Sequence, residues 1–248
     1  MSITPVRSIS TNVETSTSSS ALLDLINKTK KVTVKQPLVW IDCEMTGLEV
    51  FQDDHIIEIC CIITDGDLNI IEENGYESTV YYDKQVLDNM NEWCVTQHTK
   101  SGLVAKILSH PEQTLEKVNQ EIIEYVKKYI PQERVGILAG NSIHMDKFFL
   151  MKEFKPLIDH LHYRLVDVSS IMEMGNRHNP RLMRCYPKKK GNHTAKSDIL
   201  ESLEQLKWYR DHYLKSENEV KSFIEDYESK QVDIEGDDSD KVIKKRKV

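Results

Sequence analysis

The stretch that decides the fold is PLVWIDCEMTGL, residues 37–48, an apolar run with two carboxylates in its middle. The apolar residues predict a buried β-strand over 38–45. Side chains alternate across a strand, so Asp42 and Glu44 point to the same face and are neighbours. Two adjacent carboxylates repel each other unless arginine, a shared proton or a bound cation offsets their charge. The strand therefore predicts either a salt-bridged pair or a cation site.

The segments that flank this strand alternate between strand and helix periodicity. Patterns typical of strands cover 55–64, 68–73, 78–83, 135–141 and 164–168, and patterns typical of helices cover 112–130, 142–154 and 194–214. Strands come first and are then interleaved with helices, which favours an α/β fold with a mixed sheet flanked by helices. Thr194 is expected to cap the closing helix.

The length and composition fit one domain with two tails. At 248 residues and 39% hydrophobic, the chain is long and apolar enough to bury one substantial core. Residues 1–36 are rich in Ser and Thr, which predicts a disordered segment or a targeting peptide. Residues 37–214 form the predicted domain, and 215–248 form a charged C-terminal tail that ends in the basic cluster KKRKV.

Charge and cysteine content exclude several classes of protein. The formal net charge is −7, and residues 38–215 carry it, which excludes a broad basic groove for long nucleic acid. The five cysteines show no CxxC and no metal-ligand spacing, so we expect no disulfide framework and a reducing compartment. No apolar run approaches the roughly 20 residues that cross a bilayer, so we expect no membrane insertion.

Three further residues stand in positions suited to chemistry. Asp146 follows an apolar strand and the turn AGNS, where a carboxylate can reach a cleft at the strand's carboxyl end. His193 ends a polar loop, and Asp198 lies five residues later, inside the closing helix. Each residue alone has an ordinary structural explanation, as a helix-dipole partner or a surface side chain. Together with Asp42 and Glu44, they favour a metal-dependent active site.

The motifs that carry these residues resemble those of a known enzyme family. Asp-x-Glu in IDCEMTGL, Asp in GNSIHMD and His-x4-Asp in HTAKSD are similar to the three exonuclease motifs of the DEDDh superfamily. Within it, WIDCEMTGL, HYRLVDVSSI and ESLEQLKWYRDHY resemble the oligoribonucleases, which are 3′-to-5′ exoribonucleases of short RNA. The resemblance covers residues 37–214 and implies a ribonuclease H-like sheet, a homodimer, and release of 5′-mononucleotides from oligonucleotides of two to five residues.

The resemblance also implies residue roles. Asp42, Glu44, Asp146 and Asp198 would hold two divalent cations, Mg²⁺ or Mn²⁺, because these ions prefer oxygen ligands. His193 would act as the general base, since an unperturbed histidine pKa near 6.5 suits proton transfer at neutral pH. The metal, catalytic and base roles thus fall on five residues of the predicted domain.

Substrate contacts are implied on two sides of this site. Leu48, Trp93 and His98 match residues that embrace the terminal base, and aromatic stacking is indifferent to base identity. Residues matching the grip on the other end of a short substrate are Ser142, Arg164 and Ser169, and Tyr163 matches a tyrosine that reaches the site across the dimer. The chain departs from the family at Met172, where a lysine is frequent, so part of the phosphate grip is in question.

Two other functions and three compartments stay open on the sequence. The same metal motifs serve exonucleases of DNA or longer RNA, and the chain could instead be a catalytically idle nucleic-acid-binding adaptor. The N-terminal segment and the family favour mitochondria, whereas KKRKV favours the nucleus, with the cytoplasm as a further alternative.

Overall fold

The computed structural model describes residues 34–187 and 194–230. The predicted N-terminal segment up to residue 33, the base His193 and the KKRKV cluster lie outside the described residues. Within the described part, no helix is both long and apolar enough to cross a membrane.

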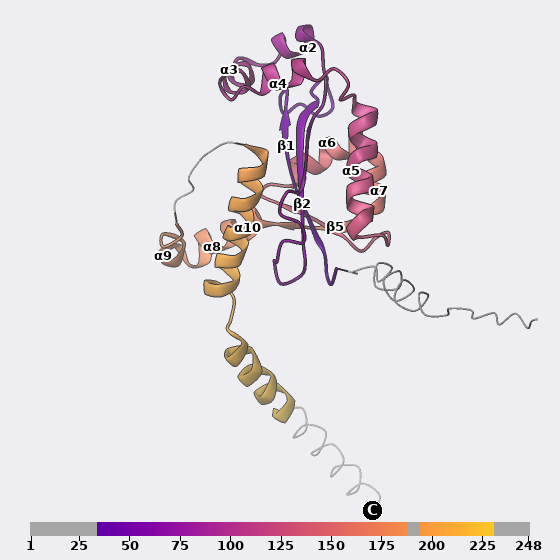
Figure 1. Cartoon of the computed structure of the whole chain (residues 1–248). Coiled ribbons are helices and arrows are strands. Elements are labelled where there is room, and N and C mark those ends of the chain that lie inside the picture. Colours follow the sequence, from indigo (N-terminus) through magenta and orange to yellow (C-terminus); the bar gives the residue numbers. More distant parts are fainter. Residues whose placement is uncertain (1–33, 188–193, 231–248) are drawn as a thin grey trace, which may run out of the picture. The chain divides into compact units, whose positions relative to one another are not determined.

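The centre of the fold is one five-stranded mixed sheet (Figure 1). Strand β1 (Leu38–Met45) pairs antiparallel with β2 (Ile56–Thr64), and β2 pairs antiparallel with β3 (Tyr76–Thr79). On its other edge β1 runs parallel to β4 (Ile137–Gly140), which runs parallel to β5 (His162–Asp167). The strand order is therefore β3-β2-β1-β4-β5, and it confirms the predicted mixed sheet.

Helices flank this sheet on both faces (Figure 1). They are α2 (Lys84–Asp88), α3 (Glu92–Lys100), α4 (Leu103–Ser109), α5 (Leu115–Tyr129), α6 (His144–Glu153), α7 (Lys155–His160), α8 (Val168–His178), α9 (Pro180–Met183) and α10 (Ala195–His212). Residues 217–230, inside the predicted tail, are also helical and exposed to solvent. Helices α2, α3 and α4 gather at one end of β1 and β2 (Figure 1).

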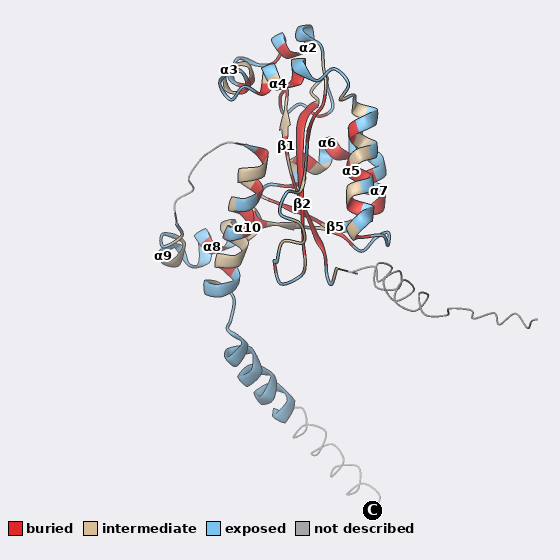
Figure 2. Ribbon diagram, in the orientation of Figure 1, coloured by how far each residue is buried: buried red, intermediate tan, exposed pale blue. Residues whose placement is uncertain are grey.

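The alternation of β1 side chains divides the interior into two cores. Val39 and Ile41 pack with residues of α5, α6 and α7 on one face. Trp40 packs with residues of α8 and α10 on the other face. Both faces of β2 are buried over its whole length, which explains its nearly continuous apolar sequence (Figure 2). Asp42 and Glu44 share the Trp40 face, on the side that α10 covers.

The structure corrects two predicted strands and adds helices. The predicted strand over 68–73 is wrong: Leu68 adopts a φ of 68°, and only Ile70 bridges to the neighbouring strand. The piece predicted at 78–83 is instead the strand Tyr76–Thr79, which follows a turn at Gly75 (φ 68°). Helices α2, α3 and α4 were not predicted, because each is too short to show a clear apolar period.

Candidate active site

Three carboxylates meet where β1 approaches the start of α10. Asp42, Glu44 and Asp198 each offer one oxygen, and these atoms all lie within 4.8 Å of one another. The strand supplies two of them through its alternation. The helix supplies the third because Thr194 caps α10 through a capping box with Ser197, which places Asp198 in the first turn. The predicted convergence of these three acids is thus present in the structure.

Asp146 lies beside this group on α6 and is buried. Its Oδ1 accepts a hydrogen bond of 3.0 Å from the backbone N–H of Cys43, the residue between the two β1 acids. The predicted helix over 142–154 begins only at His144, because Ser142 has a φ of 56° and cannot continue a helix. Asp146 therefore adjoins the three clustered carboxylates and is fixed to the same strand.

The pKa values of two of these carboxyl groups are raised, because the groups are partly or fully buried close to other acids. Desolvation, together with the nearby Glu58, Asp198 and Asp146 carboxylates, raises the pKa of Glu44 from 4.5 to about 7. Burial likewise raises the pKa of Asp146 from 3.8 to about 7, although its backbone hydrogen bonds act in the opposite direction. An arrangement of oxygen ligands that resists full ionisation fits a divalent cation, which would offset the repulsion.

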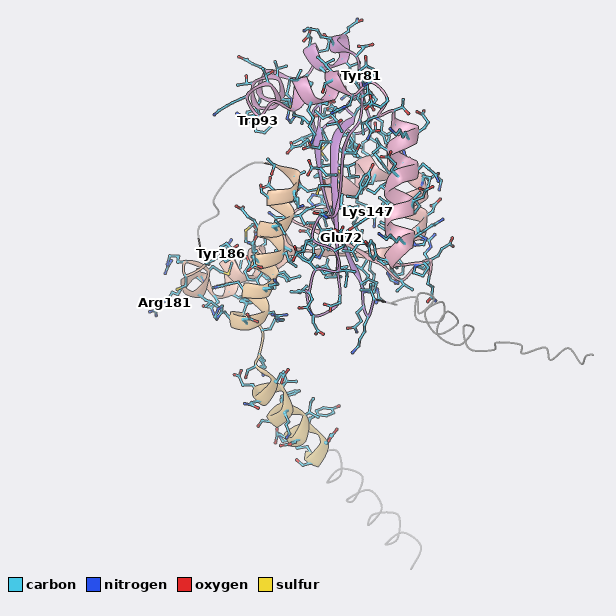
Figure 3. All side chains as sticks on the ribbon, in the orientation of Figure 1. Glu72, Tyr81, Trp93, Lys147, Arg181 and Tyr186 are labelled. Atoms are coloured by element: carbon cyan, nitrogen blue, oxygen red, sulfur yellow. The ribbon has the colours of Figure 1, made fainter. Side chains whose placement is uncertain are left out.

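A cleft of about 810 Å³ opens beside the carboxylates. Its walls include Trp93 and His98 from α3 and Lys106 from α4. His98 is buried, with Nε2 3.0 Å from the carbonyl oxygen of Met45. Trp93 is 68% exposed, so its ring is available to a ligand; Figure 3 labels it on α3. Leu48 is equally exposed but does not line the cleft.

The residues predicted to grip the other end of a substrate form a separate group around Asp167. One oxygen of this carboxylate accepts hydrogen bonds from the backbone N–H of Ser142 (3.0 Å) and from both the N–H (2.9 Å) and the hydroxyl (2.6 Å) of Ser169. Tyr163 and Arg164 are exposed on the edge strand β5, with the guanidinium carbon 5.5 Å from the ring centroid. None of these residues lines the cleft.

Comparison with known proteins decides the family. The exonuclease family model RNase_T matches residues 39–206. The mitochondrial oligoribonuclease of Saccharomyces cerevisiae is 54% identical over 198 residues, which are 77% of this chain and 73% of that protein. The chain belongs to the oligoribonuclease family. The human mitochondrial oligoribonuclease is 40% identical over 189 residues, 76% of this chain and 78% of that protein.

Solved structures agree with this family at the level of fold. Escherichia coli exonuclease I in complex with a dT13 oligonucleotide superposes with a TM-score of 0.55 at 12% identity. The match covers 72% of this chain and 42% of that one, so it shows the shared fold alone. The predicted ribonuclease H-like fold is confirmed.

The family confirms the predicted enzyme class, a 3′-to-5′ exoribonuclease of short RNA. Membership and the carboxylate cluster together indicate that it uses a divalent metal. The fold brings Asp42, Glu44, Asp198, Trp93 and His98 to one cleft and holds Asp146 next to it.

Sequence reasoning missed three charged residues that organise the site. Asp167 caps α8, and an aspartate at the end of an apolar strand, two residues before Ser169, could have signalled a cap. Glu58 stands alone in the apolar run HIIEICCIIT, which is the same signal that marked Asp42 and Glu44. Lys106, which binds Glu58, has no such signal because a lysine on a short helix is unremarkable.

Proposed function

We propose that the chain removes 3′-terminal nucleotides, as 5′-monophosphates, from single-stranded RNA of two to five nucleotides. Asp42, Glu44, Asp146 and Asp198 hold two divalent cations, Mg²⁺ or Mn²⁺. The observation that carries this proposal is the cluster of three carboxylates within 4.8 Å, placed in a cleft beside an exposed tryptophan. When bound, such cations stabilise the charge that develops on the attacking and departing oxygens.

The residues predicted to act on the 3′ end each have a defined task in this proposal. His193, which directly precedes the cap of α10, takes a proton from the attacking water. Trp93 and Leu48 hold the terminal base by apolar contact, because stacking accepts any base. His98 is fixed by its contact with the Met45 carbonyl and closes the inner wall of the cleft. The site therefore binds the 3′ end irrespective of sequence.

The group around Asp167 sets the preferred length. Ser142, Ser169 and Arg164 hold the 5′ end of a short RNA, and Asp167 fixes the two serines by its three hydrogen bonds. A longer chain must displace this contact, and the net charge of −7 offers its extra phosphates no attraction. Short RNA is favoured because both of its ends are held.

The proposal includes a homodimer in which Tyr163 reaches the site of the second copy. Its support is the 68% exposure of this ring on an edge strand, together with the family resemblance. Mixing Asp42→Asn with Tyr163→Ala protein should then restore part of the activity, since a mixed dimer contains one intact composite site. Failure to recover activity after confirmed subunit exchange would contradict the shared site.

We also propose mitochondrial residence, because relatives in yeast and human are named mitochondrial oligoribonucleases. Imaging the full chain beside versions that lack residues 1–36 or 241–248 tests the two terminal segments separately. Loss of mitochondrial signal only in the first version supports the proposal, and nuclear signal that depends on 241–248 contradicts it.

The test of function is a competition in one tube between a labelled RNA dinucleotide and a labelled RNA 20-mer, with a DNA 20-mer as a second competitor. The proposal predicts that the dinucleotide is consumed first, with a higher kcat/KM than either long strand. Trp93→Ala should lower kcat/KM for all substrates, whereas Arg164→Ala should selectively remove the advantage of the dinucleotide. Preference for a 20-mer would leave an exonuclease but overturn the length assignment.

A further inference from the structure

An ion-paired lysine lines the same cleft as the metal-binding carboxylates. The Nζ of Lys106 lies 2.8 Å from a carboxylate oxygen of Glu58 and 2.9 Å from one of Glu77. Glu58 is buried, with 8% exposure, whereas the side chains of Lys106 and Glu77 are each 41% exposed. All three residues line the cleft.

The sheet register places these acids on the same face as the metal-binding pair. Glu44 stands opposite Glu58 in the β1–β2 pairing. Cys60 of β2 pairs with Asp42 of β1 on one side and with Glu77 of β3 on the other. Because side chains alternate along each strand, the four carboxylates of β1, β2 and β3 share one face of the sheet and make it acidic.

Such a surface opposes the entry of a phosphodiester unless its charge is offset. Cations held by Asp42 and Glu44 would neutralise the part of this face on β1. Glu58 and Glu77 lie beyond them, and Lys106 supplies the positive charge there. Lys106 also connects α4 to β2 and β3, and α4 packs against α3, which carries Trp93.

Resting on the proposed function, we propose that Lys106 is a positioning residue for RNA hydrolysis. Its ammonium group offsets the negative charges of Glu58 and Glu77 beside the metal-binding carboxylates. It acts through these two acids and not through contact with RNA. Loss of the lysine leaves a buried carboxylate unpaired beside the path of the scissile phosphate, which weakens RNA binding.

The test is a double-mutant cycle on Lys106 and Glu58, measured as kcat and KM on an RNA trinucleotide with Mn²⁺. Lys106→Met should raise KM roughly tenfold with a smaller change in kcat, because the repulsion acts already on the bound substrate. Adding Glu58→Gln should return KM to within about threefold of the parent, because no unpaired buried charge is left and Glu77 is partly exposed to solvent. Lys106→Arg should retain most of the parent activity.

Two controls separate this role from others. Lys100→Met removes a positive charge from the wall of the same cleft without breaking the ion pair of buried Glu58. Its effect on KM should therefore be smaller than that of Lys106→Met. Adding Glu58→Gln should not change that effect. Calorimetric titration of Mn²⁺ without RNA should show that Lys106→Met binds the ion at least as tightly as the parent, since the freed carboxylates add negative potential.

Two results would overturn the proposal. A double variant as impaired as Lys106→Met would mean that the lysine contacts RNA directly. Weaker Mn²⁺ binding by Lys106→Met, in step with its loss of activity, would indicate a purely structural role. If Lys106→Met does not fold, a folded and active double variant still supports the role of Glu58. Failure of the parent chain to cut RNA would instead contradict the proposed function.

Discussion

Two groups of acids around this sheet differ in what surrounds their carboxylates. At the clamp, formed by Glu153, His55 and Ile56, the carboxylate lies 2.6 Å from the His55 ring and accepts the Ile56 N–H at 2.9 Å. At the acidic cleft, formed by Asp42, Glu44 and Asp198, Glu44 faces other carboxylates, and its histidine neighbour, His98, is 4.0 Å away. A buried acid supplied with donors stabilises the fold. Acids gathered together repel one another, and a bound cation would offset that repulsion.

The largest expected effect comes from removing one acid of the cleft. Asp42→Asn should reduce hydrolysis of an RNA dinucleotide to background, because the metal-binding group loses a ligand and a charge. The same variant should be at least as stable as the parent in EDTA, since fewer carboxylates repel one another. Turnover and thermal melting measured on one preparation check both statements, and parental turnover would remove Asp42 from the site.

The next largest effect concerns the base. His193→Ala should slow hydrolysis by roughly 10²–10⁴-fold, which is the usual contribution of a positioned general base. KM should change much less, because the histidine acts on the attacking water. Single-turnover kinetics separate the two quantities, and a loss confined to binding would exclude the proposed role.

Removing the carboxylate of the clamp should lower stability and leave activity unchanged, which is the reverse of the effect expected for Asp42→Asn. Glu153→Ala removes the partner of His55 and the acceptor of the Ile56 N–H, which should lower the free energy of unfolding by about 2 kcal/mol. For a domain of this size that corresponds to roughly 4–8 °C in Tm. At temperatures where the variant is folded, kcat should match the parent. A variant with parental Tm but impaired kcat would show that the two groups of acids are not distinct in role.

The smallest effect is a pH dependence of stability in the absence of metal. Native Glu44 keeps its proton up to about pH 7, whereas in the unfolded chain it loses the proton near 4.5. Between these values the native state holds the extra proton, so raising the pH lowers stability, and the loss is complete above about pH 7. Melting in EDTA should fall by roughly 5 °C between pH 5 and 7.5. Mn²⁺ should reverse this loss, and a Tm that rises with pH in EDTA would contradict the assignment.

The sequence of β1 was sufficient to predict the strand and to place Asp42 and Glu44 on the same face. Side chains two residues apart on a strand always point to the same side. The closing helix and its Thr194 cap were also predicted correctly, since an N-cap residue before an amphipathic run is a local signal. The confirmed family assignment came from motifs that extend beyond these periodicities.

Features that depend on tertiary contacts were not predictable in the same way. The Lys106–Glu58 ion pair joins residues 48 positions apart, and the Asp167–Ser142 hydrogen bond spans 25. The short helices α2, α3 and α4 are stabilised by packing around Ile57 and Leu87 and not by their own sequence period. Consequently the sequence indicated which acids lie close together better than it indicated what holds them in place.

The most direct measurement of the central claim is hydrolysis of an RNA dinucleotide carrying a label at its 3′ nucleotide. With Mn²⁺ the parent should release the labelled mononucleotide, with EDTA it should release none, and Asp42→Asn should release none in either condition. Glu153→Gln, which keeps an oxygen acceptor at the clamp, should behave as the parent does. Hydrolysis by the parent in EDTA, or by Asp42→Asn with Mn²⁺, would contradict the account of the acidic cleft as a metal-dependent active site.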